Sequence, residues 1–258
     1  MLGPVLGILA AVGVIFYFLF RNPRVDPDKP FPKKWRRMLQ NHVAFYNDLN
    51  QAEKNRFETA VRQFLADVRV KGVKTRATQL DKLLVAASAV IPLFGFPGWR
   101  YNNLNEVLLY PGNFDRDFDT DAKKKDVLGM VGNGSMQRMM VLSRPALRRG
   151  FKNKTSKKNV GIHEFVHLVD KADGATDGLP EEIIPDEYVK PWLRLMHEEI
   201  KAIENDDSDI NPYAATSEAE FLSVTTEYLF SRPHLFEKKH PKLYAIMEKM
   251  YNQDLSVH

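Results

Sequence analysis

A glutamate and two histidines in the middle of the chain have the types and the spacing that metal-dependent hydrolysis requires. His163, Glu164 and His167 form the pattern H-E-x-x-H. On a helix, positions i and i+4 lie on one face, so both imidazoles can reach one metal ion. A glutamate beside that ion can take a proton from a bound water. The pattern predicts that His163 and His167 hold Zn²⁺ and that Glu164 is the general base. The alternative is a pair of core histidines without a metal.

A third ligand must come from another part of the chain, because catalytic zinc usually has three protein ligands and a water. The chain has no cysteine, so this ligand is a His, Asp or Glu side chain. Glu220 is our preferred candidate, because it begins an apolar segment that predicts a buried helix. Glu220 also follows Ser217 in a capping-box pattern, so it could simply cap its own helix. Glu227 lies on the same helical face, either behind the ligands or as a surface acid.

Several other residues near the motif are weaker candidates. A metzincin-type extension requires a glycine and then a third histidine after His167, but these positions hold Asp170 and Asp173. We therefore reject that extension and keep Asp173 as a low-ranking ligand. Asp170 shares the face of the two histidines and could orient one of them. The remaining loose candidates for the third ligand are His197, His234 and His240.

The pattern of apolar residues predicts a mainly helical α+β fold with a small sheet. Residues 159–172, which contain the motif, are predicted to form a buried helix. Amphipathic segments at residues 35–50, 57–68 and 80–91 predict a helical subdomain, and residues 186–204 a charged helix. The predicted strands are residues 107–110 and 138–143. The second strand could be the edge that pairs with an extended peptide.

Residues 115–126 carry alternating aspartates that suggest a calcium loop. However, Thr120 stands at the sixth position, where such a loop needs glycine, and Asp126 at the twelfth, where it needs glutamate. We interpret this segment as a solvated loop.

The first segment of the chain is long and apolar enough to cross a membrane. Residues 2–20 contain no charged side chain, and at ~1.5 Å per residue they span roughly the ~30 Å hydrocarbon core. We predict a transmembrane helix at residues 1–21, a proline-rich basic stalk at 22–34 and a peptidase domain at 35–258. A signal peptide or a core helix fits less well, because no basic residue precedes the run. Basic residues follow it, so the domain is predicted to face the cytoplasm.

Composition agrees with one ordinary globular domain plus this appendage. The chain has 258 residues, of which 44% are hydrophobic and 27% charged. Its net charge of +4 is mild, and scattered basic residues usually form a solvated face. We therefore expect no direct nucleic-acid partner.

Several motifs together resemble the MtfA family of bacterial zinc peptidases. They include residues 159–170 around the H-E-x-x-H pattern, residues 211–215 (Asn-Pro-Tyr-Ala-Ala) and the pair Glu220-Phe221. Upstream segments such as Val107-Leu108-Leu109-Tyr110-Pro111-Gly112 occur in the expected order. The resemblance covers about residues 31–250.

The resemblance implies a gluzincin-like, zincin-type fold related to the catalytic domain of anthrax lethal factor. It implies that His163, His167 and Glu220 bind Zn²⁺, that Glu164 is catalytic, and that Tyr213 lies at the metal. Tyr213 would either stabilise an oxyanion or occupy the open metal position at rest. Substrates would be peptides or proteins.

The best-known family member binds the glucose repressor Mlc, which implies an alternative function as a membrane-tethered regulator that sequesters a transcription repressor. Family members are typically cytosolic, whereas the apolar segment here predicts a single-pass protein of the bacterial inner membrane.

Overall fold

The computed structural model describes residues 25–26, 28–113, 128–131 and 138–255. The predicted transmembrane helix at 1–21 and the aspartate-rich loop at 115–126 lie outside these residues. Within the described part of the chain, no helix is long and apolar enough to cross a membrane. The predicted stalk is described only from residue 25, and its last two residues already belong to the first described helix.

The three amphipathic segments in the first third of the chain form helices, as predicted. They are α2 (Lys33–His42) and α3 (Ala44–Asp48), α4 (Gln51–Asp67), and α5 (Gln79–Val90). The first segment is two helices because Val43, buried between them, is extended. Asn50 and Thr78 cap α4 and α5 in complete capping boxes, in which the third helical residue returns the hydrogen bond. These caps explain where both helices begin.

A four-stranded sheet follows, with the strand order β1-β2-β4-β3. Its strands are β1 (Arg69–Gly72), β2 (Glu106–Tyr110), β3 (Gly129–Val131) and β4 (Met139–Ser143). The first three in spatial order run parallel, whereas β3 is antiparallel to β4. The two predicted strands are confirmed as β2 and β4, but the prediction that residues 138–143 form the edge is wrong. β4 pairs on both sides, and the short strand β3 ends the sheet.

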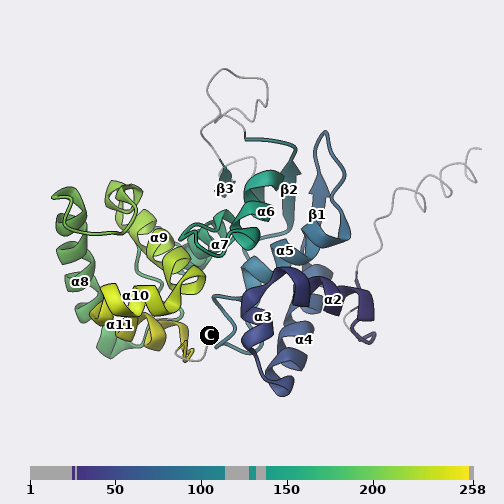
Figure 1. The fold of residues 1–258 in the computed structure, drawn as a ribbon, viewed down its shortest axis with the longest axis horizontal. Coiled ribbons are helices and arrows are strands. Elements are labelled where there is room, and N and C mark those ends of the chain that lie inside the picture. Colours follow the sequence, from purple (N-terminus) through teal and green to yellow (C-terminus); the bar gives the residue numbers. More distant parts are fainter. Residues whose placement is uncertain (1–24, 27, 114–127, 132–137, 256–258) are drawn as a thin grey trace, which may run out of the picture.

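The rest of the described chain is helical (Figure 1). Its elements are α6 (Arg144–Lys152), α7 (Val160–Asp170), η2 (Lys171–Asp173), α8 (Asp186–Glu204), η3 (Pro212–Thr216), α9 (Glu218–Ser231), α10 (Pro233–Lys239) and α11 (Pro241–Tyr251). The predicted helices around residues 159–172 and 186–204 are confirmed as α7 and α8. Helix α6, between β4 and the motif helix, was not predicted. The fold is thus mainly helical α+β with a small sheet, as predicted.

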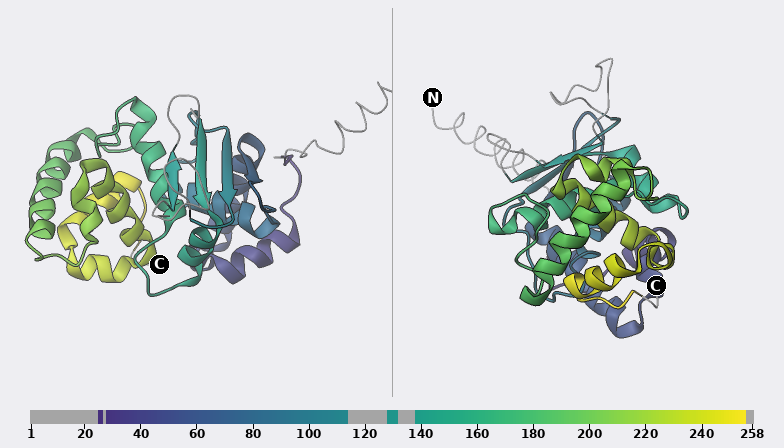
Figure 2. Two further views of the ribbon diagram at one scale, coloured as in Figure 1. Left: turned by 90° about the horizontal axis from the view of Figure 1, so that it is seen from above. Right: turned by 90° about the vertical axis from the view of Figure 1, so that its left-hand side faces the viewer.

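Helix α7 lies between the two halves of the molecule. The sheet and helices α2–α5 are on one side of α7, and helices α8–α11 are on the other (Figures 1 and 2). Phe165 of α7 is fully buried, and its ring lies 5.5 Å from that of Phe64 and 5.1 Å from that of Tyr101. A Cβ at Gly161 would come within 2.1 Å of the Ser88 hydroxyl, so α5 and α7 pack at close range. This packing fixes the position of α7 and of the motif it carries.

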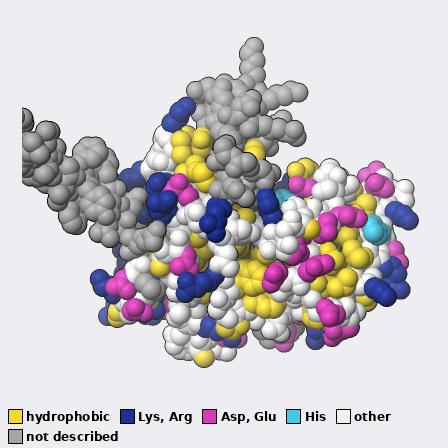
Figure 3. All heavy atoms as spheres, turned by 180° about the vertical axis from the view of Figure 1, so that it is seen from behind, with side chains coloured by type: hydrophobic (Ala, Val, Ile, Leu, Met, Phe, Trp, Pro, Cys, Tyr) yellow, Lys and Arg dark blue, Asp and Glu magenta, His cyan; other side chains and the backbone are white. Residues whose placement is uncertain are grey.

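Charged side chains of both signs are interspersed with hydrophobic patches on the face of the molecule shown in Figure 3. The modest net charge of +4 is therefore not gathered into one basic surface on that face.

Candidate metal centre

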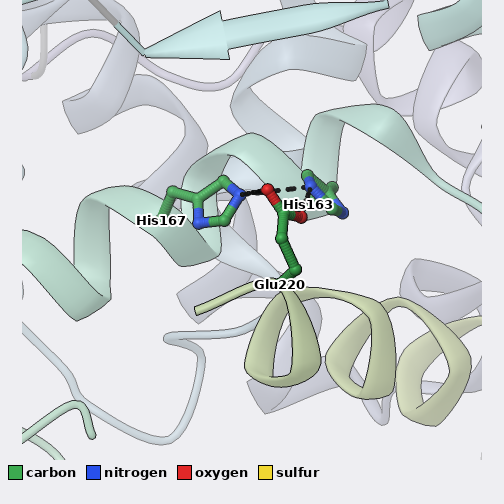
Figure 4. A group of neighbouring side chains, drawn as sticks. All are labelled: His163, His167 and Glu220. Carbon is green, nitrogen blue, oxygen red and sulfur yellow. Dashed lines mark hydrogen bonds and ion pairs between the residues drawn. The ribbon is translucent and has the colours of Figure 1, made fainter. Parts of the chain in front are cut away.

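Helices α7 and α9 bring His163, His167 and Glu220 together (Figure 4). The Nε2 atoms of the two histidines are 3.2 Å apart. Glu220 Oε2 lies 3.0 Å from His163 Nε2, and Glu220 Oε1 lies 3.5 Å from His167 Nε2. One ligand atom from each residue lies within 4.8 Å of the others, a grouping that could hold a metal ion. The structure thus brings together the three side chains that the sequence nominated as ligands.

A residue of α9 contacts the Nδ1 atom of each imidazole, on the side of the ring away from the candidate metal position. His163 Nδ1 lies 2.6 Å from Oε1 of Glu227, and His167 Nδ1 lies 3.2 Å from Oγ of Ser223. When Nδ1 donates to these oxygens, both Nε2 atoms carry lone pairs, and they face the same point. Sequence reasoning left Glu227 undecided and missed Ser223. The signal available for both was their spacing from Glu220, which places all three on one face of α9.

Glu220 stands at a position where a glutamate often caps its helix. The Ser217 side chain accepts a hydrogen bond from the backbone N–H of Glu220 at 3.2 Å. The return bond, present from Glu53 in α4 and Asp81 in α5, is not among the bonds that α9 makes. The Glu220 carboxylate instead turns to the histidines. The alternative interpretation, in which Glu220 only caps its own helix, therefore does not agree with the position of its carboxylate.

The charges around the histidines favour a cation at this point. Burial opposes protonation of His163, but the carboxylates of Glu227 and Glu220 raise its pKa well above the usual value. Burial also disfavours the Glu220 carboxylate, but hydrogen bonding to the two histidines holds its pKa far below the usual range. The same carboxylates would stabilise a bound divalent cation. The donor set of two imidazoles and a carboxylate therefore fits a metal ion.

Glu164 is buried beside the edge strand of the sheet. Burial raises the pKa of its carboxyl group, an effect that the neighbouring histidines partly offset. A Cβ at Gly129 of β3 would lie 2.5 Å from Glu164 Oε1, so the β3 backbone passes directly over this carboxylate. Sequence reasoning missed β3, since a three-residue strand gives little pattern to detect.

A cleft of about 460 Å³ opens over these groups. Leu128 and Gly129 line one side of it, and His163, Glu164 and Tyr213 are among its other lining residues. A cavity of this size can enclose part of an extended peptide. The candidate base and one of the proposed ligands, His163, thus face a space that a substrate could enter.

Tyr213 lies at the mouth of the site on η3. Its side chain is 52% exposed, and its hydroxyl donates to Glu220 Oε1 at 3.3 Å. Its ring centroid is 6.2 Å from that of His163. This position is compatible with both roles that the family resemblance suggested.

The weaker candidates are engaged elsewhere. Asp170 was expected to orient a histidine, but its Oδ2 accepts from the Gly178 backbone N–H at 3.2 Å, and burial raises its pKa to about 6. Asp173 accepts from backbone N–H groups of its own loop. His197 pairs with Glu218, and His240 pairs with Asp209 and Glu199. His234 is exposed and is not part of the candidate ligand group. Among the described residues, that group consists of His163, His167 and Glu220.

The chain is similar to known proteins over most of its length. A profile of the family described as "Glucose-regulated metallo-peptidase M90" matches residues 19–252. Mlc titration factor A from Pectobacterium atrosepticum is 28% identical over 223 residues, which cover 80% of this chain and 81% of that protein. Mlc titration factor A from Escherichia fergusonii is 29% identical over 231 residues, with 82% and 83% covered. A Synechocystis protein named "Uncharacterized protein slr2042" is 24% identical over 257 residues, with 95% and 93% covered.

The profile spans far more than the H-E-x-x-H helix, because it runs from before the first described residue to the end of α11. The resemblance to the MtfA family is thereby confirmed, and with it the assignment to metallopeptidases. The chain belongs to the family of glucose-regulated metallopeptidases M90.

Proposed function

We propose that this protein is a zinc-dependent metallopeptidase in which His163, His167 and Glu220 hold the zinc and Glu164 is the general base. The observation that carries the proposal is the convergence of two imidazole Nε2 atoms and one carboxylate at distances of 3.0 to 3.5 Å. Two ligands of a tetrahedral zinc ion are about 3.3 Å apart, given Zn–N and Zn–O bonds of about 2.0–2.1 Å. The residues present therefore fit Zn²⁺ without rearrangement of the helices.

The zinc, when bound, supplies Lewis acidity that polarises the scissile carbonyl and lowers the pKa of a bound water towards ~7. Glu164 would accept a proton from the attacking water and would then pass it to the leaving amine. Tyr213, whose hydroxyl already lies near Glu220, donates to the oxygen on which negative charge develops. Glu227 and Ser223 keep the two imidazoles in the tautomer that leaves Nε2 free.

The edge strand β3 is the proposed docking element for an extended substrate. Among the described strands, β3 pairs only with β4, so its other edge is available to a peptide main chain. Because the β3 backbone lies over Glu164, a peptide paired along it would pass the base and the metal ligands. This combination of a motif helix beneath an edge strand supports the proposal of a zincin-like domain.

The decisive experiment is substrate profiling of the wild-type protein against Glu164→Gln. We expect the variant to bind about one zinc per chain and to lose hydrolysis by ~10²–10⁴-fold, the usual contribution of a general base. Glu198→Gln, an exposed position on α8, is the matched control and should keep full activity. A purified protein without zinc, or equal hydrolysis by the Glu164→Gln variant, would contradict the proposal.

A second candidate function is a regulator that binds and sequesters a transcription repressor. Two relatives are named Mlc titration factor A, which is the observation that favours this candidate. It is tested by capture of the repressor on wild-type and Glu164→Gln protein. Equal capture, together with a cellular phenotype that survives loss of hydrolysis, would make binding the primary function.

We also propose that residues 1–21 anchor the protein in the bacterial inner membrane as a single-pass segment, with the domain in the cytoplasm. The support is the uncharged run at residues 2–20 and the basic residues after it. Protease added to intact spheroplasts should leave the domain uncut, whereas protease added to inverted vesicles should digest it. The opposite pattern would reverse the orientation, and recovery of the full chain without membranes would exclude the anchor.

A further inference from the structure

Two basic side chains that line the cleft have no charged partner among the described residues. Arg149 lies in the last turn of α6, Lys158 lies just before α7, and both line the 460 Å³ cleft. Both are exposed, and neither side chain makes a hydrogen bond or an ion pair with another described residue. The acidic residues that line the same cleft are Glu164 and Glu227, which are buried at the metal centre.

Three other cations of α6 and of the segment before α7 do have partners. Arg144 and Arg148 of α6 lie 3.2 and 2.6 Å from the buried Asp81. Lys157 lies 2.8 Å from Asp209. The fold therefore uses the neighbouring cations to hold its elements together. Arg149 and Lys158 instead keep their charge available in the cleft.

The backbone around these two residues is tied to the site. The backbone N–H of Asn159 donates to Glu227 Oε2 at 2.5 Å, and the Asn159 side chain caps α7. A Cβ at Gly150 would lie 3.0 Å from Asn159, so the end of α6 packs against the start of α7. Both cations thus stand at the N-terminal end of α7, where the helix dipole also favours a negative group.

The same part of the cleft has apolar walls. Ala146, Val160 and Val224 line it together with the two cations. Val160 precedes His163 by about one helical turn, roughly 5 Å along the axis. A substrate group that fits here has a short aliphatic stem and an anionic end. A carboxylate meets both requirements, since arginine binds it through two parallel hydrogen bonds.

We infer that Arg149 and Lys158 determine specificity and select substrates that carry a carboxylate next to the scissile bond. This inference rests on the proposed peptidase function. The carboxylate belongs either to an Asp or Glu side chain or to the C-terminus of the peptide. Neither Arg149 nor Lys158 takes part in the chemical step, so their replacement should alter substrate choice and not metal binding.

The test uses the full chain, loaded with zinc, and quenched peptides that differ at one position beside the cleaved bond. That position carries Glu, Gln or Lys, and a second set compares free and amidated C-termini. The variants are Arg149→Glu, Lys158→Glu and the double variant. Lys152→Glu is the control, because this exposed lysine of α6 changes the net charge equally and does not line the cleft. Binding of the same peptides is measured by fluorescence anisotropy on wild-type and Glu164→Gln protein.

We expect the wild type to prefer the carboxylate substrate by about tenfold or more in kcat/KM. The preference should weaken as salt shortens the Debye length, and the double variant should prefer Lys. Preference for Glu regardless of the C-terminus identifies a side-chain carboxylate, whereas loss on amidation identifies the C-terminal one. The Lys152→Glu variant should behave as wild type.

Two outcomes would overturn the inference. One is hydrolysis without a preference for a carboxylate in either peptide set. The other is a preference that the double variant retains. If no peptide is hydrolysed, the proposed peptidase function fails, and the anisotropy measurements alone decide whether the cleft selects a carboxylate.

Discussion

The two motif histidines are oriented by two residues of α9. Glu227 and Ser223 contact the Nδ1 atoms of His163 and His167, respectively. A ligand held in this way loses less rotational freedom when it binds a metal, and its tautomer is fixed in advance. Each of the two histidines therefore has Nε2 directed at the candidate metal position and Nδ1 in contact with a residue of α9.

Replacement of Glu227 by glutamine tests this pairing. We expect Glu227→Gln to lower zinc affinity by ~10–100-fold, because the amide holds the imidazole less firmly and carries no charge. Affinity is measured by competition with a chromophoric chelator. Glu218→Gln, an exposed position on the same helix, should bind zinc as the wild type does. Equal affinity in the two variants would show that Glu227 has no role at the metal.

At this scale the sequence nominated the proposed ligands and base, left the role of Glu227 undecided and missed Ser223. His163, Glu164, His167 and Glu220 were found because their types and spacing suit a known chemistry. The role of Asp170 was left open as a residue that could orient a histidine, because a shared helical face does not fix the direction of a side chain. The backbone N–H of Gly178 binds the Asp170 carboxylate instead.

The contact between β3 and α7 places Glu164, the proposed base, beneath the edge strand. Gly129→Ala would put a methyl group within 2.5 Å of Glu164 Oε1, so the carboxylate must shift. A displacement of about 1 Å from the reactive geometry can cost ~10²-fold in rate. The methyl group would also lie 2.6 Å from Cγ and 2.7 Å from Cδ of Glu164, so the side chain must move from Cγ outwards, and we expect a large loss of kcat.

The control for this prediction is Gly112→Ala. A Cβ at Gly112 meets nothing within 4 Å, so its kcat should match that of the wild type. A Gly129→Ala variant with wild-type kcat would show that the β3 backbone does not constrain the base.

The close approach of α5 and α7 at Gly161 has a different consequence. Alanine favours helix over glycine by ~1 kcal/mol, but a Cβ here lies 2.1 Å from the Ser88 hydroxyl. Overpacking of a core costs ~1–3 kcal/mol, so we expect Gly161→Ala to destabilise the protein in urea unfolding. Ser88→Gly removes the clashing atoms, and the double variant should recover part of the loss. Additive effects would contradict direct contact.

Among the elements, the long amphipathic helices and the five-residue strands β2 and β4 were predictable, whereas the shortest strands were not. α4, α5, α7 and α8 have clear periodicity and recognisable caps or breaks. β1 and β3 contain four and three residues, too few to show alternation. Strand order depends on contacts across the chain, so β4 could not be recognised as an inner strand. α6 was hidden by its high content of arginine and lysine.

A cluster of charged side chains around Asp209 connects elements in the C-terminal half of the molecule. His240 Nε2 lies 2.7 Å from Asp209, and His240 Nδ1 lies 3.4 Å from Glu199 of α8. Burial opposes protonation of His240, but its bonds to these carboxylates raise its pKa. Burial also opposes ionisation of Asp209, yet bonds from Lys157, His240 and Tyr228 lower its pKa to about 2.

Stability should therefore depend on the protonation of His240. Because its pKa is raised on folding, its stabilising contribution is complete below the unfolded value of about 6.5 and disappears as the pH rises through the folded value. We expect His240→Gln to lower the free energy of unfolding by about 1–3 kcal/mol at pH 6 and by less at pH 9. Urea unfolding at both pH values measures this difference.

The control for the pH effect is His197→Gln. His197 has an acidic partner too, but its side chain is 56% exposed, so its pairing with Glu218 should contribute little at either pH. A His240→Gln effect that is equal at pH 6 and pH 9 would show that the charge of His240 does not stabilise the fold.

For the molecule as a whole, the fold class was predictable because composition and periodicity are summed over many residues. The proposed anchor is also a sequence prediction, and it remains one because residues 1–21 lie outside the described part. The arrangement of the two halves around α7 could not be predicted, because it depends on close contacts such as that of Gly161 with Ser88.

The edge of β3 that pairs with no other described strand sets a condition on any protein target, whatever its sequence. Pairing with a strand edge uses the target's own backbone groups, which are already occupied inside a helix or a sheet. A target segment must first open, and each 1.4 kcal/mol of opening free energy lowers the fraction of open chains about tenfold. Two proteins with the same cleavage site would therefore be cut at rates set by their local stability, and a destabilised protein would be degraded before its folded counterpart.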